Sequence, residues 1–285
     1  MTRAEGSHAA ATQTLVERTQ HYIGGQWVDP ASDDTIEVVD AATEEVMGRV
    51  PAGTPQDVDR AVAAARAAFD SWSQVPLGDR VALCSAVGMR LQDRAEEIAA
   101  LIAQELGCPI TLSMMIQAGL PAMTFSSQEH LVEHLPWEQQ IGNSLVLREP
   151  VGVVSAITPW NYPLHQIAAK VAPAMTAGCT VVLKQSEVTP LNAYILAEIM
   201  DEVGAPDGVF NLVCGTGEAV GEPLAAHRGV DLVSLTGSTR AGTRVAALAA
   251  PTVKKVALEL GGKSAAVVLE GADLARAVAE VTEQS

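Results

Sequence analysis

From Val151 onward, short runs of β-branched and aliphatic residues alternate with stretches that have helical spacing. Six of these runs are predicted as strands: 151–157, 180–183, 209–213, 231–235, 253–258 and 265–269. Strands that are separated by helices pair in parallel, because a parallel neighbour requires a long crossover connection, and those helices then cover both faces of the sheet. The alternation therefore predicts an α/β fold with a mostly parallel sheet.

The first half of the chain is predominantly helical in pattern. Residues 1–20 read as a loose polar leader, and the segment IGGQW (23–27) reads as a short strand and turn. Residues 56–72 have apolar positions at helical spacing, with a helix start signal before them, and residues 79–106 continue as one or two more helices. We expect these helices to form a scaffold beside the sheet.

A possible hairpin lies between the two halves. The segment EQQIGNSLVLREPV (138–151) contains a Gly142, Asn143 turn flanked by strand-like residues. Such a turn supports two short antiparallel strands.

Charge and hydropathy exclude several classes of protein. The formal net charge is −16, from 34 acidic against 18 basic residues, which opposes binding to nucleic acid or to an anionic membrane. Two long uncharged runs, 106–128 and 150–169, are interrupted by proline and are not predicted to span a membrane. The N-terminus has no apolar segment of the secretory type, and the four cysteines show no paired metal or dense disulfide spacing. These features favour a cytoplasmic protein.

The segment VKKVALELGGKS (253–264) places a single carboxylate, Glu259, between a hydrophobic strand and two glycines. Val253, Val256 and Leu258 are expected to pack inward, and the glycines allow a sharp turn beside a ligand. That position suits a catalytic base. Taken alone, this segment favours an ordinary acidic residue at a strand end.

Further blocks extend the pattern. They are ITPWNYPLHQIAAKVAPAMTAGCTVVLK (157–184) with Gln185, Ser186 and Glu187, LTGSTRAG (235–242), LELGGKS (258–264), IGGQW (23–27) and ELGCPI (105–110). In order and spacing these blocks closely resemble the aldehyde dehydrogenase superfamily, over nearly the whole chain from Tyr22. The resemblance implies a Rossmann-like, mostly parallel sheet with flanking helices, N-terminal scaffold helices and a projecting hairpin that takes part in subunit association.

The resemblance also implies roles for individual residues. Glu259 matches the glutamate that activates water to hydrolyse a thioester, and Asn161 matches the amide that donates to the oxyanion formed when a thiolate attacks the aldehyde. The positions that match cofactor contacts are Ile157, Thr158, Trp160, Lys184, Glu187, Gly217, Gly237, Ser238, Gly242 and Leu260. These residues imply NAD as cofactor and an aldehyde as substrate.

Glu187 bears on the choice between NAD and NADP. A carboxylate after a strand can accept hydrogen bonds from both ribose hydroxyls, whereas a 2′-phosphate would meet its negative charge. NAD is therefore expected in preference to NADP. Gln185 stands where the family usually has proline, so the loop geometry departs from the family pattern at this point.

Two glycine-rich turns are candidates for the phosphate site. Gly215, Gly217 and Gly221 resemble a dinucleotide fingerprint, but Gly221 comes one residue late. The resemblance instead places the pyrophosphate at GSTRAG (237–242), at a strand-to-helix turn where backbone N–H groups and the helix dipole face the ligand. Without the flanking blocks, that turn is also compatible with an ordinary helix cap.

Two other motifs have ordinary alternatives. Cys179 lies near the expected cofactor segment but at the start of a strand that has a buried pattern, which favours a structural thiol over a nucleophile. The HLVEH string at 130–134 matches a zinc-peptidase pattern, yet it falls in the expected scaffold helices and has no evident third ligand.

The family's nucleophilic cysteine is expected a few tens of residues beyond the glutamate. Here 285 − 259 = 26 residues follow Glu259, and none is cysteine. The expected organisation is a flexible leader (1–20), an NAD-binding domain (21–137 and 151–270), an oligomerisation hairpin (138–150) and the start of a catalytic domain (271–285). The chain is thus expected to be the cofactor-binding part of an aldehyde dehydrogenase that forms homo-oligomers. A non-catalytic dinucleotide-binding or subunit-interaction protein is the alternative.

Overall fold

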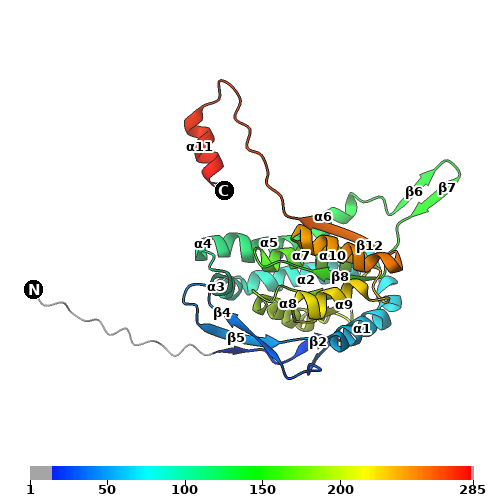
Figure 1. The fold of residues 1–285 in the computed structure, drawn as a ribbon. Helices are drawn as coiled ribbons and strands as arrows, with labels where there is room; N and C mark the ends of the chain where they lie inside the picture. Colours follow the sequence, from blue (N-terminus) through cyan, green and yellow to red (C-terminus); the bar gives the residue numbers. More distant parts are fainter. Residues whose placement is uncertain (1–14, 284–285) are drawn as a thin grey trace, which may run out of the picture.

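The structure, a computed structural model, describes residues 15–283, and within them it forms three sheets. The largest sheet has seven strands in the spatial order β12-β11-β8-β9-β10-β2-β3 (Figure 1). Its five parallel strands are β12 (Lys255–Leu260), β11 (Leu232–Gly237), β8 (Val153–Ile157), β9 (Thr180–Lys184) and β10 (Phe210–Leu212). β2 (His21–Ile23) and β3 (Gln26–Val28) extend it as an antiparallel pair. The predicted α/β fold with a mostly parallel sheet is confirmed.

Helices cover both faces of this sheet, and alternate residues of β9 show how. Val181 and Leu183 belong to one apolar core, whereas Val182 between them belongs to the other, because successive side chains of a strand point to opposite faces. The first core is completed by α2 (Leu77–Asp93), α3 (Ala95–Leu106), α5 (Gly119–Ser126), α7 (Pro163–Thr176) and α8 (Leu191–Glu202). The second core is completed mainly by α1 (Pro55–Ser73), α9 (Glu222–Ala226) and α10 (Thr239–Ala249).

The helices of the first half match the sequence pattern. α1 begins where Asp57 accepts hydrogen bonds from the backbone N and the hydroxyl of Thr54, at 2.8 and 2.9 Å. Residues 79–106 divide into α2 and α3 at Arg94. The connection to the hairpin is built from α4 (Ile110–Leu112), the π-helix η1 (Ser113–Ala118), α5 and α6 (Gln128–Glu133). The predicted scaffold helices are confirmed.

The turn in IGGQW joins β2 to β3. Gly24 and Gly25 both have positive φ, +62° and +75°, a conformation that favours glycine because it has no Cβ. The predicted strand and turn are therefore present.

A small second sheet precedes the helices. β4 (Thr35–Val39) and β5 (Val46–Pro51) form an antiparallel pair that the sequence pattern did not reveal, and β1 (Val16–Glu17) adds in parallel to β5. The prediction of a loose leader through residue 20 is thus wrong for residues 16 and 17, because their backbone is paired with Gly48 and Arg49. Residues 1–14 of that leader lie outside the described residues.

The hairpin expected at 138–151 is confirmed. β6 (Glu138–Ile141) and β7 (Ser144–Leu147) pair antiparallel around Gly142, and they project from the body of the molecule (Figure 1). All eight strand residues are exposed.

Two predictions about the last strands are wrong. β12 is an edge strand, so its face is largely uncovered: Val253 precedes it at 90% exposure and Val256 is exposed, while only Leu258 is half-buried. Residues 265–269 form no strand, because no strand among the described residues pairs with them. After β12 the chain follows an extended, exposed path to α11 (Leu274–Glu283) (Figure 1).

Among residues 15–283, no helix combines the length and the apolar character needed to cross a membrane.

Candidate active site

The predicted site residues gather at one edge of the large sheet. Because the strands are parallel, their carboxyl ends lie together: Ile157 is in register with Lys184 and Leu235, and Thr236 with Glu259. This edge carries Ile157, Thr158, Trp160 and Asn161 after β8, Lys184 and Glu187 after β9, Gly217 after β10, Gly237 and Ser238 after β11, and Glu259 and Leu260 on β12. Ligands of open α/β sheets bind at such edges.

Lys184 and Glu187 form the charged centre of this edge. Lys184 is 3% exposed, and its Nζ donates to Oε2 of Glu187 at 2.5 Å. Burial opposes ionisation of Glu187, but the Lys184 ammonium outweighs it and holds the pKa of Glu187 below its usual value; the backbone of Gly217 also favours the ionised form. A half-buried carboxylate is therefore kept charged beside Gly217.

Two capped helix starts lie at the same edge. Thr216 accepts from the N–H of Ala219 at the start of the π-helix η2 (Gly217–Gly221), and Ser238 accepts from the N–H of Ala241 at the start of α10. A Cβ added at Gly217 would meet nothing within 4 Å. Backbone N–H groups at helix starts attract anions, so both turns can face phosphate groups.

Two of the predicted cofactor positions, Gly242 and Ile157, have packing contacts within the protein. Gly242 lies within α10, its N–H donates to the carbonyl of Ser238, and a Cβ there would stand 2.5 Å from a methyl group of Leu260. The side chain of Ile157 belongs to the second apolar core. Gly242 thus allows α10 to approach β12 closely, and its N–H does not point to a ligand.

Asn161 follows β8 in an exposed loop. Its carbonyl accepts from Nε2 of Gln117 at 3.1 Å, and together with Gln117 and Cys108 it lines a pocket of about 210 Å³. Thr158 before it is buried, and Trp160 is 53% exposed. The loop therefore places Asn161 at a small hollow and leaves Trp160 exposed.

Glu259 has a neighbour that the sequence pattern did not identify. Lys170 on α7 donates from Nζ to the hydroxyl of Ser234 at 3.2 Å; burial lowers the pKa of Lys170, and the Glu259 carboxylate raises it. Lys170 is an isolated charge on an amphipathic helix, so only the structure reveals that it lies near the exposed Glu259.

None of the four cysteines is positioned and activated as a nucleophile. Burial raises the pKa of all four thiols, to about 11 for Cys84 and Cys214. Cys179 precedes the first residue of β9 and so lies at the opposite end of that strand from Lys184. Cys108 is half-buried beside the Asn161 pocket, and its thiol donates to the carbonyl of Pro109. Thiols with raised pKa contain little thiolate, the nucleophilic form.

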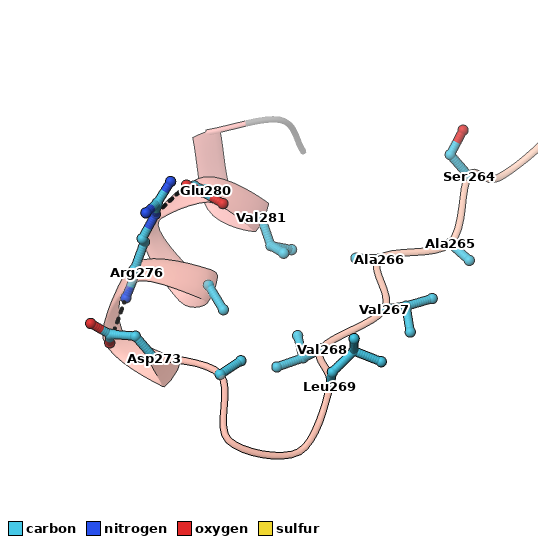
Figure 2. A pocket seen from close by; sticks show the side chains of 12 residues that line it. Ser264, Ala265, Ala266, Val267, Val268, Leu269, Asp273, Arg276, Glu280 and Val281 are labelled. Carbon is cyan, nitrogen blue, oxygen red and sulfur yellow. Dashed lines mark hydrogen bonds and ion pairs between the residues drawn. The ribbon is translucent and has the colours of Figure 1, made fainter.

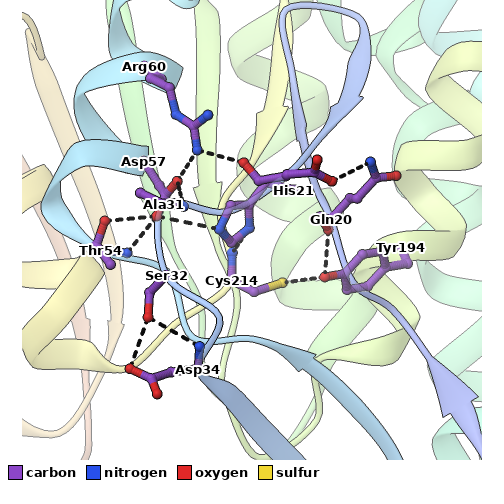
Figure 3. Close-up of polar contacts among 11 residues, drawn as sticks. Gln20, His21, Ala31, Ser32, Asp34, Thr54, Asp57, Arg60, Tyr194 and Cys214 are labelled. Atoms are coloured by element: carbon purple, nitrogen blue, oxygen red, sulfur yellow. Dashed lines mark hydrogen bonds and ion pairs between the residues drawn. The ribbon is translucent and has the colours of Figure 1, made fainter.

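A cluster centred on His21 resembles a catalytic dyad but is sealed from solvent. Figure 3 shows His21 between Asp57 and Cys214: Nδ1 accepts from the backbone N of Cys214 at 3.3 Å, and Nε2 lies 3.8 Å from Oδ2 of Asp57. Burial lowers the pKa of His21 to about 4. The neutral, fully buried imidazole joins β2 to the segment after β10 and has no access to a substrate.

A hollow of about 660 Å³ contains none of the predicted site residues. It lies between the extended segment 264–269, which includes Val267, Val268 and Leu269, and α11, which carries Arg276 and Glu280 (Figure 2). Its lining is mainly aliphatic. It therefore marks an uncovered apolar surface and not the candidate site.

His130 and His134, which belong to the zinc-peptidase-like string, do not share a helix: α6 ends at Glu133, and Nδ1 of His134 contacts the carbonyl of His130. Residues 15–283 contain no group of three or more His, Cys, Asp or Glu side chains placed to hold a metal ion.

Comparisons with known proteins agree on one family. Residues 27–285 match the profile described as the aldehyde dehydrogenase family. A 3-succinoylsemialdehyde-pyridine dehydrogenase from a Pseudomonas species is 52% identical over 260 residues, which are 91% of this chain and 54% of that protein.

Solved structures agree with the sequence relatives. A mutant aldehyde dehydrogenase C from Pseudomonas syringae, crystallised with NAD+ and octanal, superposes with a TM-score of 0.89 at 47% identity, over 91% of this chain and 54% of that chain. Lactaldehyde dehydrogenase from Escherichia coli gives 0.90 at 38% identity, over 95% and 57%. The chain spans about half the length of these relatives.

Proposed function

The chain belongs to the aldehyde dehydrogenase family, and from that premise we propose that it is the NAD-binding part of an enzyme that oxidises an aldehyde to a carboxylic acid. The observation that carries the proposal is the meeting of the Lys184–Glu187 pair with two capped helix starts at one sheet edge. The pair supplies a cation and a carboxylate for the ribose, and the helix starts supply N–H groups for the pyrophosphate. The mutant aldehyde dehydrogenase C from Pseudomonas syringae, which is 47% identical to this chain, was crystallised with NAD+, and this supports NAD as the cofactor here.

Two residues at the same edge, Asn161 and Glu259, suit the chemistry of the aldehyde. NAD supplies the hydride acceptor when it is bound. We assign Asn161 to donate to the substrate oxygen as negative charge develops there, and Glu259 to take a proton from water. Lys170 lies near Glu259, whose carboxylate raises the pKa of the lysine.

By itself the chain is proposed to bind the cofactor without oxidising aldehydes. This follows from the thiols, since Cys84 and Cys214 are buried with pKa values near 11 and Cys179 lies at the wrong end of β9. The non-catalytic dinucleotide-binding function is thus the proposal for residues 1–285 alone, and aldehyde oxidation is the proposal for the complete enzyme.

The hairpin is proposed to join subunits of a homo-oligomer. β6 and β7 expose Ile141, Leu145 and Leu147 at 57%, 57% and 53%, on a projection that contributes no residue to either apolar core. Sedimentation or light scattering of Leu145→Asp is expected to show a smaller assembly than wild type. An unchanged assembly would remove the hairpin from the interface.

A cytoplasmic location is proposed because all four cysteines are free thiols.

The cofactor proposal is tested by comparing two carboxylate variants by titration calorimetry. Glu187→Ala is expected to weaken NAD binding about tenfold or more, since a charge-assisted hydrogen bond contributes roughly 1.5–3 kcal/mol. Glu202→Ala is the matched control. Glu202 is an exposed acid at the C-terminal end of α8, away from the Glu187 loop, and it pairs with Arg90. Equal NAD affinity in both variants would contradict the role of Glu187.

A further inference from the structure

A buried carboxylate links α3 to two loops of the candidate site. Glu105 is 3% exposed near the end of α3, and its two oxygens accept from the backbone N of Leu191 at 2.5 Å and from Nδ2 of Asn192 at 3.0 Å. Both donors belong to the first turn of α8. Glu105 therefore caps α8 from another helix, where a carboxylate also interacts favourably with the helix dipole.

The same contacts continue into the loops. Asn192 Nδ2 also donates to the carbonyl of Thr189 at 2.7 Å, and the Thr189 hydroxyl donates to the carbonyl of Trp160 at 3.3 Å. Thr189 and Asn192 are fully buried. The chain of contacts thus joins the loop after β9, which carries Glu187, to the loop after β8, which carries Trp160 and Asn161.

We infer that Glu105 is a positioning residue of the candidate site. Through Asn192 and Thr189, it fixes the position of the Glu187 loop relative to the Trp160–Asn161 loop. The inference rests on the proposed cofactor site. Glu105 contacts no ligand position itself, since its carboxylate is enclosed by α3 and α8. Its effect passes through the backbone of residues 187–192, where a small displacement would move the Glu187 carboxylate relative to Lys184.

The hydrogen bonds that Glu105 accepts from Leu191 and Asn192 are hard to replace with another side chain. Burial raises the pKa of Glu105 to about 7, and the hydrogen bonds from Asn192 and Leu191 oppose that rise. Glutamine has the same shape but only one acceptor oxygen, so it cannot accept both hydrogen bonds. In Glu105→Gln, the amide NH2 would face an N–H group of Asn192 or Leu191, and the connection to the loops would be lost.

The test compares Glu105→Gln with Ser113→Ala, which removes a different buried hydrogen bond to α3, from the Ser113 hydroxyl to the carbonyl of Ala99. Three properties are measured: NAD affinity by calorimetry, amide hydrogen exchange in residues 185–192 and 158–162, and the melting temperature. Glu105→Gln is expected to weaken NAD binding about tenfold and to speed exchange in both loops, whereas Ser113→Ala changes neither. Similar affinity and exchange in the two variants would overturn the inference.

Two more variants make the outcome decisive. In Glu105→Gln/Asn192→Asp, the new amide can donate to the new carboxylic acid, which can itself donate to Thr189, so NAD affinity and slow exchange are expected to recover. Thr189→Val cuts only the link to Trp160 and tests the connection if Glu105→Gln does not fold. Absence of NAD binding by the wild type would refute the cofactor proposal, yet exchange in the two loops would still decide the role of Glu105.

Discussion

The Nζ atom of Lys184 lies 2.5 Å from Oε2 of Glu187, across the first three residues that follow β9. Lys184 is held in place by burial, while the side chain of Glu187 is 37% exposed. The pair therefore presents its carboxylate outward and keeps its ammonium inward. This arrangement is suited to accept hydrogen bonds from a ribose without leaving the lysine uncompensated.

The first prediction concerns His21, whose pKa is lowered to about 4 by burial. An exposed histidine titrates near 6.5, so between pH 6.5 and 4 the unfolded chain binds a proton that the folded chain does not. The contribution of His21 to the free energy of unfolding should therefore fall by roughly 3 kcal/mol as the pH drops through that window. In urea denaturation, the difference in free energy of unfolding between the wild type and His21→Asn is expected to change by that amount, and a constant difference across the window would contradict the prediction.

The second prediction concerns Glu105 and has the opposite sign. Its pKa rises from about 4.5 to about 7 on folding, so the folded chain binds the extra proton in that window. The free energy of unfolding should therefore fall by roughly 3 kcal/mol as the pH increases from 4.5 to 7. In the wild type, the opposite contribution of His21 cancels this pH dependence of the free energy of unfolding between pH 4.5 and 6.5. The pH dependence due to Glu105 should therefore appear in His21→Asn and be absent from His21→Asn/Glu105→Gln. Identical curves for these two variants would contradict it.

The third prediction is that the chain alone produces no steady NADH signal with acetaldehyde or benzaldehyde. The reason is that burial raises the pKa of every thiol and that Cys179 lies at the far end of β9. Absorbance at 340 nm is the measurement. A signal that Cys179→Ser abolishes would identify a displaced nucleophile, and loss of a signal in Cys108→Ser would assign that role to the thiol beside Asn161.

The fourth prediction is self-association through the last helix. Leu274 and Val278 on α11 are 69% and 64% exposed, and Val267 and Leu269 in the preceding extended segment are 76% and 73% exposed. Each exposed side chain of this size forgoes roughly 1.5–3 kcal/mol of burial, which favours association. Leu274→Lys/Val278→Glu should scatter less light than wild type, whereas Met89→Lys, at an exposed position on α2, should not. A wild-type monomer that melts cooperatively above about 60 °C would contradict the prediction.

The sequence predicted the elements whose signals are local. Val153–Ile157 and Thr180–Lys184 are buried β-branched strands, and their alternation with helices was enough to place Lys184 and Glu259 at one sheet edge. Residues 265–269 have the same composition but form no strand, because pairing depends on a neighbour and not on composition.

Residues that act through distant partners were missed. Glu105 and Lys170 look like ordinary charges on amphipathic helices, and their partners Leu191 and Ser234 lie 86 and 64 positions away in the chain. Gly242 was assigned to the cofactor because its turn has the right residues, whereas the structure places it against Leu260. Local sequence patterns carry no information about such tertiary contacts.

The central claim is that the edge carrying Lys184, Glu187, Gly217 and Ser238 binds NAD in preference to NADP. Titration of both cofactors into the wild-type chain by calorimetry tests it most directly. The account predicts one site per chain with NAD bound at least about tenfold more tightly, since a 2′-phosphate would meet the Glu187 carboxylate. Binding of neither cofactor, or tighter binding of NADP than of NAD, would contradict the account.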